Sequence, residues 1–179
     1  MTPPEADDRA AWTLTRLADH LTATDHRVLG ELAPRAAAYA RRIRDVHGAQ
    51  HPELAAVAAA CDELAAALAA HLRREEDVFF PAVRRMERAV KHGEPAAAGD
   101  AQTVAASVAA LREEHRGLVA ALAALQGLTM DYALPYDACA TWDLAYRTLR
   151  DLDAALRRHL PAEDDLLLPK ALALVDATG

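Results

Sequence analysis

The hydrophobic positions of this 179-residue chain recur at helical spacing along four long stretches, separated by short polar segments. In the first stretch the recurring positions are Leu14, Leu17, Leu21, Val28, Leu32, Tyr39 and Ile43. The stretches cover about residues 8–46, 52–90, 100–128 and 135–175, after a frayed polar lead over residues 1–8. Because the connections are short, neighbouring helices should run antiparallel. The pattern predicts an all-α protein, an antiparallel up-down four-helix bundle forming a single domain over residues 1–179.

Prolines qualify this pattern. Pro52 suits the first turn of the second helix, where its missing N–H costs nothing. Pro34 is expected to kink the first helix, and Pro161 and Pro169 are expected to interrupt the last one, because proline removes a backbone donor and crowds the preceding turn.

The composition supports an all-α fold and argues against some classes of binding partner. Hydrophobic residues make up 53% of the chain but aromatic residues only 4%, since alanine, the best helix former, dominates. The net charge of −7 argues against a nucleic-acid partner. The N-terminus does not resemble a signal peptide, and no apolar run approaches the ~20 residues that cross a bilayer. Cys61 and Cys139 lie far apart in the sequence, which fits two reduced thiols in a cytoplasmic protein. We expect a cytoplasmic monomer that does not bind membranes.

One segment occurs twice. The stretch His71–Pro81 recurs 88 residues later as His159–Pro169, with His, Leu, the first Glu, an Asp and the Pro in register. Residues four apart on a helix differ by about 40° in direction and about 6 Å in height. Each copy can therefore present an imidazole and a carboxylate to one point.

The repeat extends upstream, since Asp25-His26 precedes the first copy and Glu114-His115 the second at nearly equal distances. His47, at the end of the first predicted helix, would supply a fifth imidazole. The candidate ligands of a two-metal site are His26, His47, His71, Glu75, His115, His159 and Glu163. The remaining histidines, His20, His51 and His92, are expected to point elsewhere or to lie in solvent.

A single histidine of this kind is more often a surface residue than a ligand. The set as a whole adjoins apolar stripes, where unpaired charges would be costly and a metal cluster would neutralise them. A structural zinc site usually offers cysteine, and ferritin-like sites use Glu-x-x-His and more carboxylate. On two octahedral irons, five imidazoles, four contacts from two bridging carboxylates and two contacts from one bridging oxygen together fill about eleven of twelve positions. Such an imidazole-rich site favours binding or one-electron chemistry on O₂, NO or peroxide over hydrocarbon oxidation.

These residues resemble the hemerythrin-like family, with its His, His-x-x-x-Glu, His, His-x-x-x-Glu/Asp order. The similarity is closer to the C-terminal domain of bacterial iron-sulfur cluster repair di-iron proteins. It rests on the ligand residues, on Val46-His47-Gly48, on His51–Leu54 and on the segment from Leu128 to Tyr146. The resemblance covers about Leu17 to Leu172 and places all seven candidates on iron-ligand positions, with Glu75 and Glu163 as the bridging residues. It also implies two irons joined by an oxo or hydroxo bridge.

The resemblance implies a role for Glu114, which matches the family and would support a histidine or carry protons. Family members typically carry an additional N-terminal domain with a Cys-Cys motif, which these 179 residues do not contain. An acidic residue usual four positions before the second-helix histidine is Ala67 here, and Pro161 could tilt Glu163.

The expected function is a non-haem di-iron protein that acts on O₂, NO or peroxide in nitrosative or oxidative stress. In its stronger form it reduces NO or repairs iron-sulfur clusters, with an electron donor or an iron-sulfur client protein as partner. Two alternatives stay open. One is a non-catalytic O₂ or NO carrier or sensor, and the other is a metal store or a peroxide scavenger using a different metal.

Overall fold

The computed structural model of the protein describes residues 9–178, and these residues form helices and turns but no strand. The all-α class is thereby confirmed, while the expected frayed lead lies outside the described residues. The chain divides into two compact units. The first unit comprises the chain up to His26, Leu72–Glu113, and the chain from His159 onward; the second comprises Arg27–His71 and Glu114–Arg158. The single-domain expectation stays a prediction.

Within residues 9–178, three pairs of consecutive helices are joined by short π-helical turns, in which the backbone hydrogen bonds span five residues instead of four. In chain order the elements are a 3₁₀ turn at Arg9–Ala11, α1 Leu14–Leu21, the π turn η2 Thr22–His26, α2 Arg27–His47, α3 Leu54–Arg74, the π turn η3 Glu75–Phe79, α4 Phe80–His92, α5 Ala98–Leu128, α6 Ala140–Ala162, the π turn η4 Glu163–Leu167 and α7 Leu168–Thr178.

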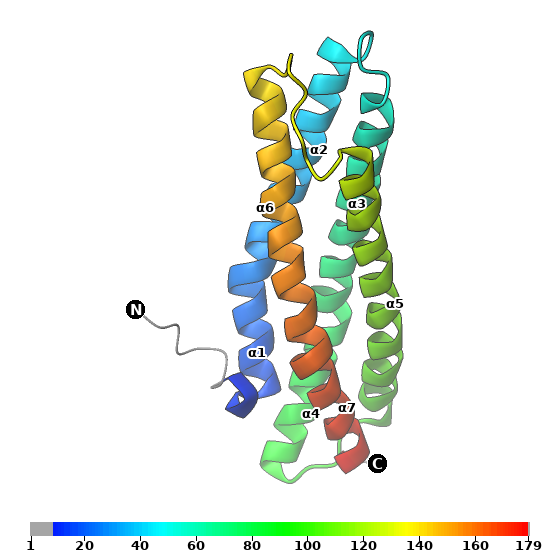
Figure 1. The fold of residues 1–179 in the computed structure, drawn as a ribbon. Coiled ribbons are helices and arrows are strands. Elements are labelled where there is room, and N and C mark those ends of the chain that lie inside the picture. The colour runs from blue at the N-terminus through cyan, green and yellow to red at the C-terminus, as the bar shows by residue number, and fades with distance from the viewer. Residues whose placement is uncertain (1–8, 179) are drawn as a thin grey trace, which may run out of the picture. The chain divides into compact units, whose positions relative to one another are not determined.

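In the first unit, α1, α4 and α7 lie side by side and the first half of α5 completes the unit (Figure 1). Four helical segments thus share one apolar core. Its members are Leu14, Leu17, Ala18, Leu21, Phe79, Phe80, Ala82, Val83, Met86, Val104, Val108, Leu111, Leu167, Leu168 and Ala171. Glu87 of α4 fixes the start of α1, because its carboxylate accepts hydrogen bonds from the N–H groups of Leu14 and Thr15 at 2.8 and 3.0 Å.

In the second unit, α2, α3, the second half of α5 and most of α6 form a closed ring of contacts (Figure 1). The contacts are the Arg41–Asp62 ion pair between α2 and α3, His71–Glu114 between α3 and α5, Gln126–Asp153 between α5 and α6, and His47–Trp142 between α2 and α6. This ring is the arrangement of a four-helix bundle.

The prolines act differently from one another. Pro34 and Pro161 lie inside α2 and α6, and the interruption expected at Pro161 comes one residue later, where α6 ends at Ala162 and η4 begins. Pro81 and Pro169 each follow a π turn, whose wider loop accommodates a residue without an N–H group. The interruption expected at Pro169 is thus a local widening of the helix.

The connection before α6 is longer than the hydrophobic pattern predicts. Met130, Asp131 and Tyr132 all have positive φ, a conformation that costs a residue with a side chain roughly 1–2 kcal/mol. The Thr129 hydroxyl helps to hold this run, since it donates to the Leu125 carbonyl and accepts from the Tyr132 N–H. A further turn, in which the Ala138 N–H bonds to the Pro135 carbonyl, follows this run, so the last helix begins at Ala140 instead of near Pro135.

The continuous helical stretch Leu54–His92 is long and apolar enough, by length and composition alone, to cross a membrane. Core helices of soluble proteins pass the same test. Here the stretch contains buried charged and polar residues, including Glu75, so this finding does not support a membrane span.

His51 lies in the connection between α2 and α3, and its imidazole contacts two carboxylates. Its Nε2 is 3.1 Å from Asp137 and its Nδ1 is 2.9 Å from Glu53, and its ring packs edge-on against Trp142. Hydrogen bonding to Asp137 and then to Glu53 raises the pKa of His51 above its ordinary value of 6.5. The protonated imidazole therefore ties the connection before α6 to the start of α3.

We expect this contact to stabilise the protein below the unfolded-state pKa and to weaken as pH rises through the higher folded-state pKa. In metal-free protein, the melting temperature lost in His51→Gln should therefore be larger at about pH 5.5 than at about pH 8.5. His92→Gln, at the exposed end of α4, is the control and should show no such trend. A His51→Gln loss that is the same at both pH values would contradict the assignment.

Candidate metal centre

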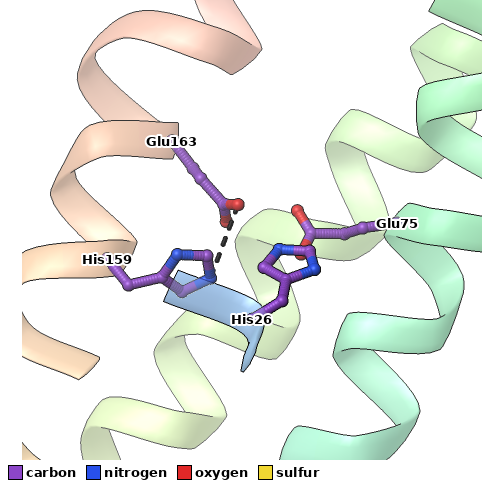
Figure 2. A group of neighbouring side chains, drawn as sticks. All are labelled: His26, Glu75, His159 and Glu163. Carbon is purple, nitrogen blue, oxygen red and sulfur yellow. Dashed lines mark ion pairs between the residues drawn. The ribbon is translucent and has the colours of Figure 1, made fainter. Parts of the chain in front are cut away.

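Two imidazoles and two carboxylates converge inside the first unit (Figure 2). They are His26, Glu75, His159 and Glu163, and each offers one ligand atom within 4.8 Å of the others. All four are buried, and both glutamates have no exposed surface. His26 ends η2, Glu75 begins η3, His159 lies near the end of α6 and Glu163 begins η4. The structure thus brings together four of the seven predicted ligands.

The two π turns place the two carboxylates in equivalent ways. The Phe80 N–H bonds to the Glu75 carbonyl, and the Leu168 N–H bonds to the Glu163 carbonyl. Single π turns within helices are frequent at functional sites. The repeat in the sequence is therefore also a repeat in backbone conformation, and Pro161 does not turn Glu163 away from the group.

His26 faces the carboxylate of Glu75, and His159 faces the carboxylate of Glu163. His26 Nε2 is 3.3 Å from Glu75 Oε2, and His159 Nε2 is 3.4 Å from Glu163 Oε1. Burial alone would lower the pKa of His26, but the Glu75 and Glu76 carboxylates outweigh it and raise that pKa above 6.5. The surroundings therefore favour positive charge at this point.

These residues fit a metal cation. Among residues 9–178, no hydrogen-bond donor or acceptor in bonding geometry reaches the buried Nε2 of His26. Two carboxylates buried so close together repel each other, and a cation between them removes that cost. Imidazole nitrogen and carboxylate oxygen are the ligand types that suit iron, manganese and zinc.

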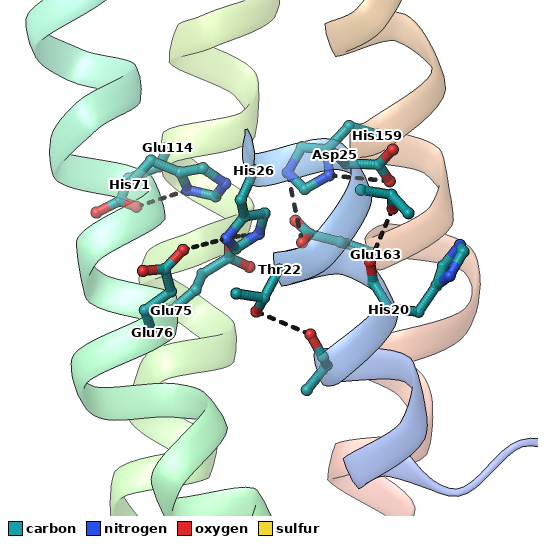
Figure 3. Close-up of polar contacts among 12 residues, drawn as sticks. His20, Thr22, Asp25, His26, His71, Glu75, Glu76, Glu114, His159 and Glu163 are labelled. Atoms are coloured by element: carbon teal, nitrogen blue, oxygen red, sulfur yellow. Dashed lines mark hydrogen bonds and ion pairs between the residues drawn. The ribbon is translucent and has the colours of Figure 1, made fainter. Parts of the chain in front are cut away.

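The outer nitrogens of these histidines also meet carboxylates (Figure 3). His26 Nδ1 is 2.7 Å from Glu76 Oε1, and His159 Nδ1 is 3.8 Å from Asp25 Oδ2. The His159 imidazole holds the pKa of Asp25 below its ordinary value. Carboxylates in this position orient metal-binding imidazoles and raise their basicity.

Asp25 and Glu76 are two functional residues that the sequence pattern did not predict. Both adjoin a predicted ligand in the sequence, Asp25 before His26 and Glu76 after Glu75. Their position next to a predicted ligand is the feature of the sequence from which a supporting role could have been predicted.

In the second unit, His71 of α3 and His115 of α5 are both buried, with ring centroids 5.0 Å apart. His71 Nδ1 lies 3.1 Å from Glu114 Oε2 (Figure 3). Glu114 therefore contacts a predicted ligand, as expected of a supporting residue.

The structure does not bring His47 into either set. Its Nε2 lies 3.1 Å from Cys139 Sγ, and its ring packs 5.2 Å from Trp142. His47 ends α2, a helix of 21 residues and thus about 31 Å long, whereas His26 immediately precedes that helix. The length of one uninterrupted helix separates the two residues.

The other histidines follow expectation. His20 packs edge-on against Trp12, His51 pairs with carboxylates and His92 is exposed at the end of α4. None belongs to the group of four.

Comparison with known proteins identifies the family. The model of the hemerythrin HHE cation-binding domain matches residues 17–171, which is most of the chain. The protein belongs to the hemerythrin HHE family. This agrees with the buried imidazoles and carboxylates, and it confirms the hemerythrin-like helical class.

Curated relatives of this hemerythrin-family chain include bacterial proteins named for iron-sulfur cluster repair. The chain is 25% identical over 154 residues to the iron-sulfur cluster repair protein ScdA of Staphylococcus epidermidis, covering 86% of this chain and 65% of ScdA. It is 26% identical over 171 residues to the iron-sulfur cluster repair protein YtfE of Edwardsiella ictaluri, covering 96% and 72%. The corresponding protein of Yersinia pestis is 24% identical over 170 residues. The chain spans 65% of the length of the Staphylococcus relative.

If Glu75 is a ligand, metal should stabilise the wild type and not Glu75→Gln, which keeps the side-chain shape but removes the charge. At free metal about 100 times its dissociation constant, the wild type should gain about 2.7 kcal/mol of unfolding free energy. Melting of both proteins with and without added Fe(II) or Co(II) measures this. Asp77→Asn, an exposed change two residues away, should keep the full gain. Equal gains in wild type and Glu75→Gln would show that Glu75 does not bind the metal.

Proposed function

We propose that this chain is a non-haem di-iron protein that acts on small ligands, NO, O₂ or peroxide, during nitrosative or oxidative stress. The observation that carries the proposal is the buried group of His26, Glu75, His159 and Glu163 in a member of a cation-binding family. The relatives named for iron-sulfur cluster repair support an iron-dependent stress role. Reduction of NO and repair of clusters are the specific activities proposed.

The proposed ligand set has six residues, namely His26, His71, Glu75, His115, His159 and Glu163. His71 and His115 join it because each is buried and because His71 precedes Glu75 by one helical turn. Glu75 and Glu163 would bridge the two ions. His47 is omitted because it lies against Cys139.

The smaller set has a chemical consequence. With four imidazoles instead of five, about two of the twelve positions of two octahedral ions stay open beside an oxo or hydroxo bridge. Iron held there would supply open positions for a small ligand and electrons for its reduction.

The surrounding residues have separate tasks. Phe80 stacks on the His26 ring at 5.6 Å and, with Phe79, keeps water from one side of the group. Glu76 and Glu114 are partly exposed, with 42% and 27% of their side chains accessible, and each touches a histidine. Reduction of NO to N₂O consumes protons as well as electrons, and these carboxylates reach both solvent and the imidazoles. This favours turnover over a carrier or sensor.

The proposed partners are an electron donor and, for repair, an iron-sulfur client protein. The names of the relatives, which refer to iron-sulfur cluster repair, support a client of that kind. We keep a cytoplasmic location and a monomer as part of the proposal.

The function is tested by loading the protein with Fe(II), counting iron per chain and adding NO without oxygen. We expect about two irons per chain and release of N₂O. Two irons with reversible gas binding and no N₂O would identify a carrier or sensor instead. Failure to bind iron, or preference for zinc or manganese, would overturn the di-iron assignment.

Glu114 should matter for turnover because it contacts the His71 imidazole. Glu114→Gln should lower the rate of NO consumption by roughly tenfold, with iron content measured in the same sample. Glu113→Gln, the exposed neighbour, is the matched control and should keep the wild-type rate. An unchanged rate in Glu114→Gln would exclude a role for this carboxylate.

A further inference from the structure

Two consecutive glutamates contact the two nitrogens of a single imidazole in the first unit (Figure 3). Glu75 Oε2 lies 3.3 Å from His26 Nε2, and Glu76 Oε1 lies 2.7 Å from His26 Nδ1. The side chain of Glu75 is fully buried, whereas that of Glu76 is 42% exposed. The inner carboxylate belongs to the proposed ligand set, and the outer one does not.

The π turn explains how adjacent residues reach the same ring. Successive side chains on an α-helix diverge by about 100°, which would direct Glu76 away from a ring that faces Glu75. In η3, which begins at Glu75, the wider turn reduces this divergence because more residues share each turn. Phe80, at the end of the same π turn, stacks on the ring at 5.6 Å. One short segment thus contacts His26 at both nitrogens and on its face.

The contact with Glu76 selects a form of the imidazole. A carboxylate only accepts hydrogen bonds when ionised, so Nδ1 must carry the hydrogen that is donated to Glu76. The Nε2 lone pair of the neutral ring then points toward Glu75 and the space between the carboxylates. Metal binding requires that lone pair.

We propose that Glu76 is a positioning residue that fixes the tautomer and orientation of His26 and strengthens its binding to the metal. The inference rests on the proposed function in one respect, that His26 is a ligand. Glu76 itself touches neither the metal nor the small ligand.

The test uses the full chain and three variants. Glu76→Gln keeps a hydrogen-bond acceptor but removes the charge, and Glu76→Leu removes both. Asp77→Asn removes one negative charge at the adjacent exposed position and is matched for charge alone. Helical content by circular dichroism confirms that each variant folds, which is expected because Glu76 is exposed.

The first readout is the affinity for Co(II) and Fe(II), measured by competition with a chelator. We expect Glu76→Leu to lose roughly 10–100-fold in affinity and Glu76→Gln to lose less, with Asp77→Asn like the wild type. The second readout is the midpoint potential of the iron-loaded protein. It should rise in Glu76→Leu, because a less basic His26 stabilises Fe(III) less, and a purely structural role would not shift it.

Wild-type affinity and potential in Glu76→Leu would overturn the inference and leave the di-iron proposal intact. An equal loss in Asp77→Asn would overturn it as well, since general charge would then be the cause. A wild type that binds metal but does not consume NO would count against the proposed activity, while the affinity series would still decide the role of Glu76. A wild type without metal affinity would overturn both.

Discussion

The burial of two carboxylates in one apolar core is the constraint on which the first unit depends. Glu75 and Glu163 have no exposed surface, and each is followed along the chain by core residues, Phe79-Phe80 and Leu167-Leu168. Like charges in such surroundings are costly unless a positive charge lies between them. The two imidazoles that face the carboxylates provide part of that compensation, and a cation would provide the rest. The apolar core fixes the positions of the two carboxylates, and the carboxylates provide the negative charge that can bind a cation.

The backbone departs from α-helical geometry where this constraint applies. In the described chain, η3 and η4 each begin at one of the buried glutamates, and each is followed by a proline. The proline removes an N–H group that an α-helix would use, and the wider turn re-pairs the backbone so that the helix can continue. Natural chains break a local rule most often at functional sites. Here the departure occurs twice, at equivalent positions of a repeat.

Much of this arrangement could be predicted from the sequence, and the rest could not for identifiable reasons. Hydrophobic spacing predicted the helices, and the spacing of four residues predicted that His159 and Glu163 lie on one helix face. Hydrophobic spacing does not signal π turns, so Glu76 was missed: ideal α-helical angles direct it away from His26. His47 was predicted as a ligand from its place at the end of the first helix and from the family resemblance, and in the structure its Nε2 lies 3.1 Å from Cys139 Sγ. The start of α6 was misplaced because a turn closed by the Ala138 N–H on the Pro135 carbonyl precedes the helix.

The distribution of exposed carboxylates bears on what kind of chemistry such a site performs. A site built only to hold a gas molecule needs apolar walls, and Phe80 beside His26 is one such wall. It does not need polar routes from the surface to its histidines. Yet in the first unit both Glu76 and Asp25 are partly exposed, at 42% and 35%, and both reach the outer nitrogen of an imidazole. Each links solvent to the buried group without opening the core. A reaction that consumes protons can use these contacts for proton transfer, whereas reversible gas binding uses the Glu76 contact only to position His26.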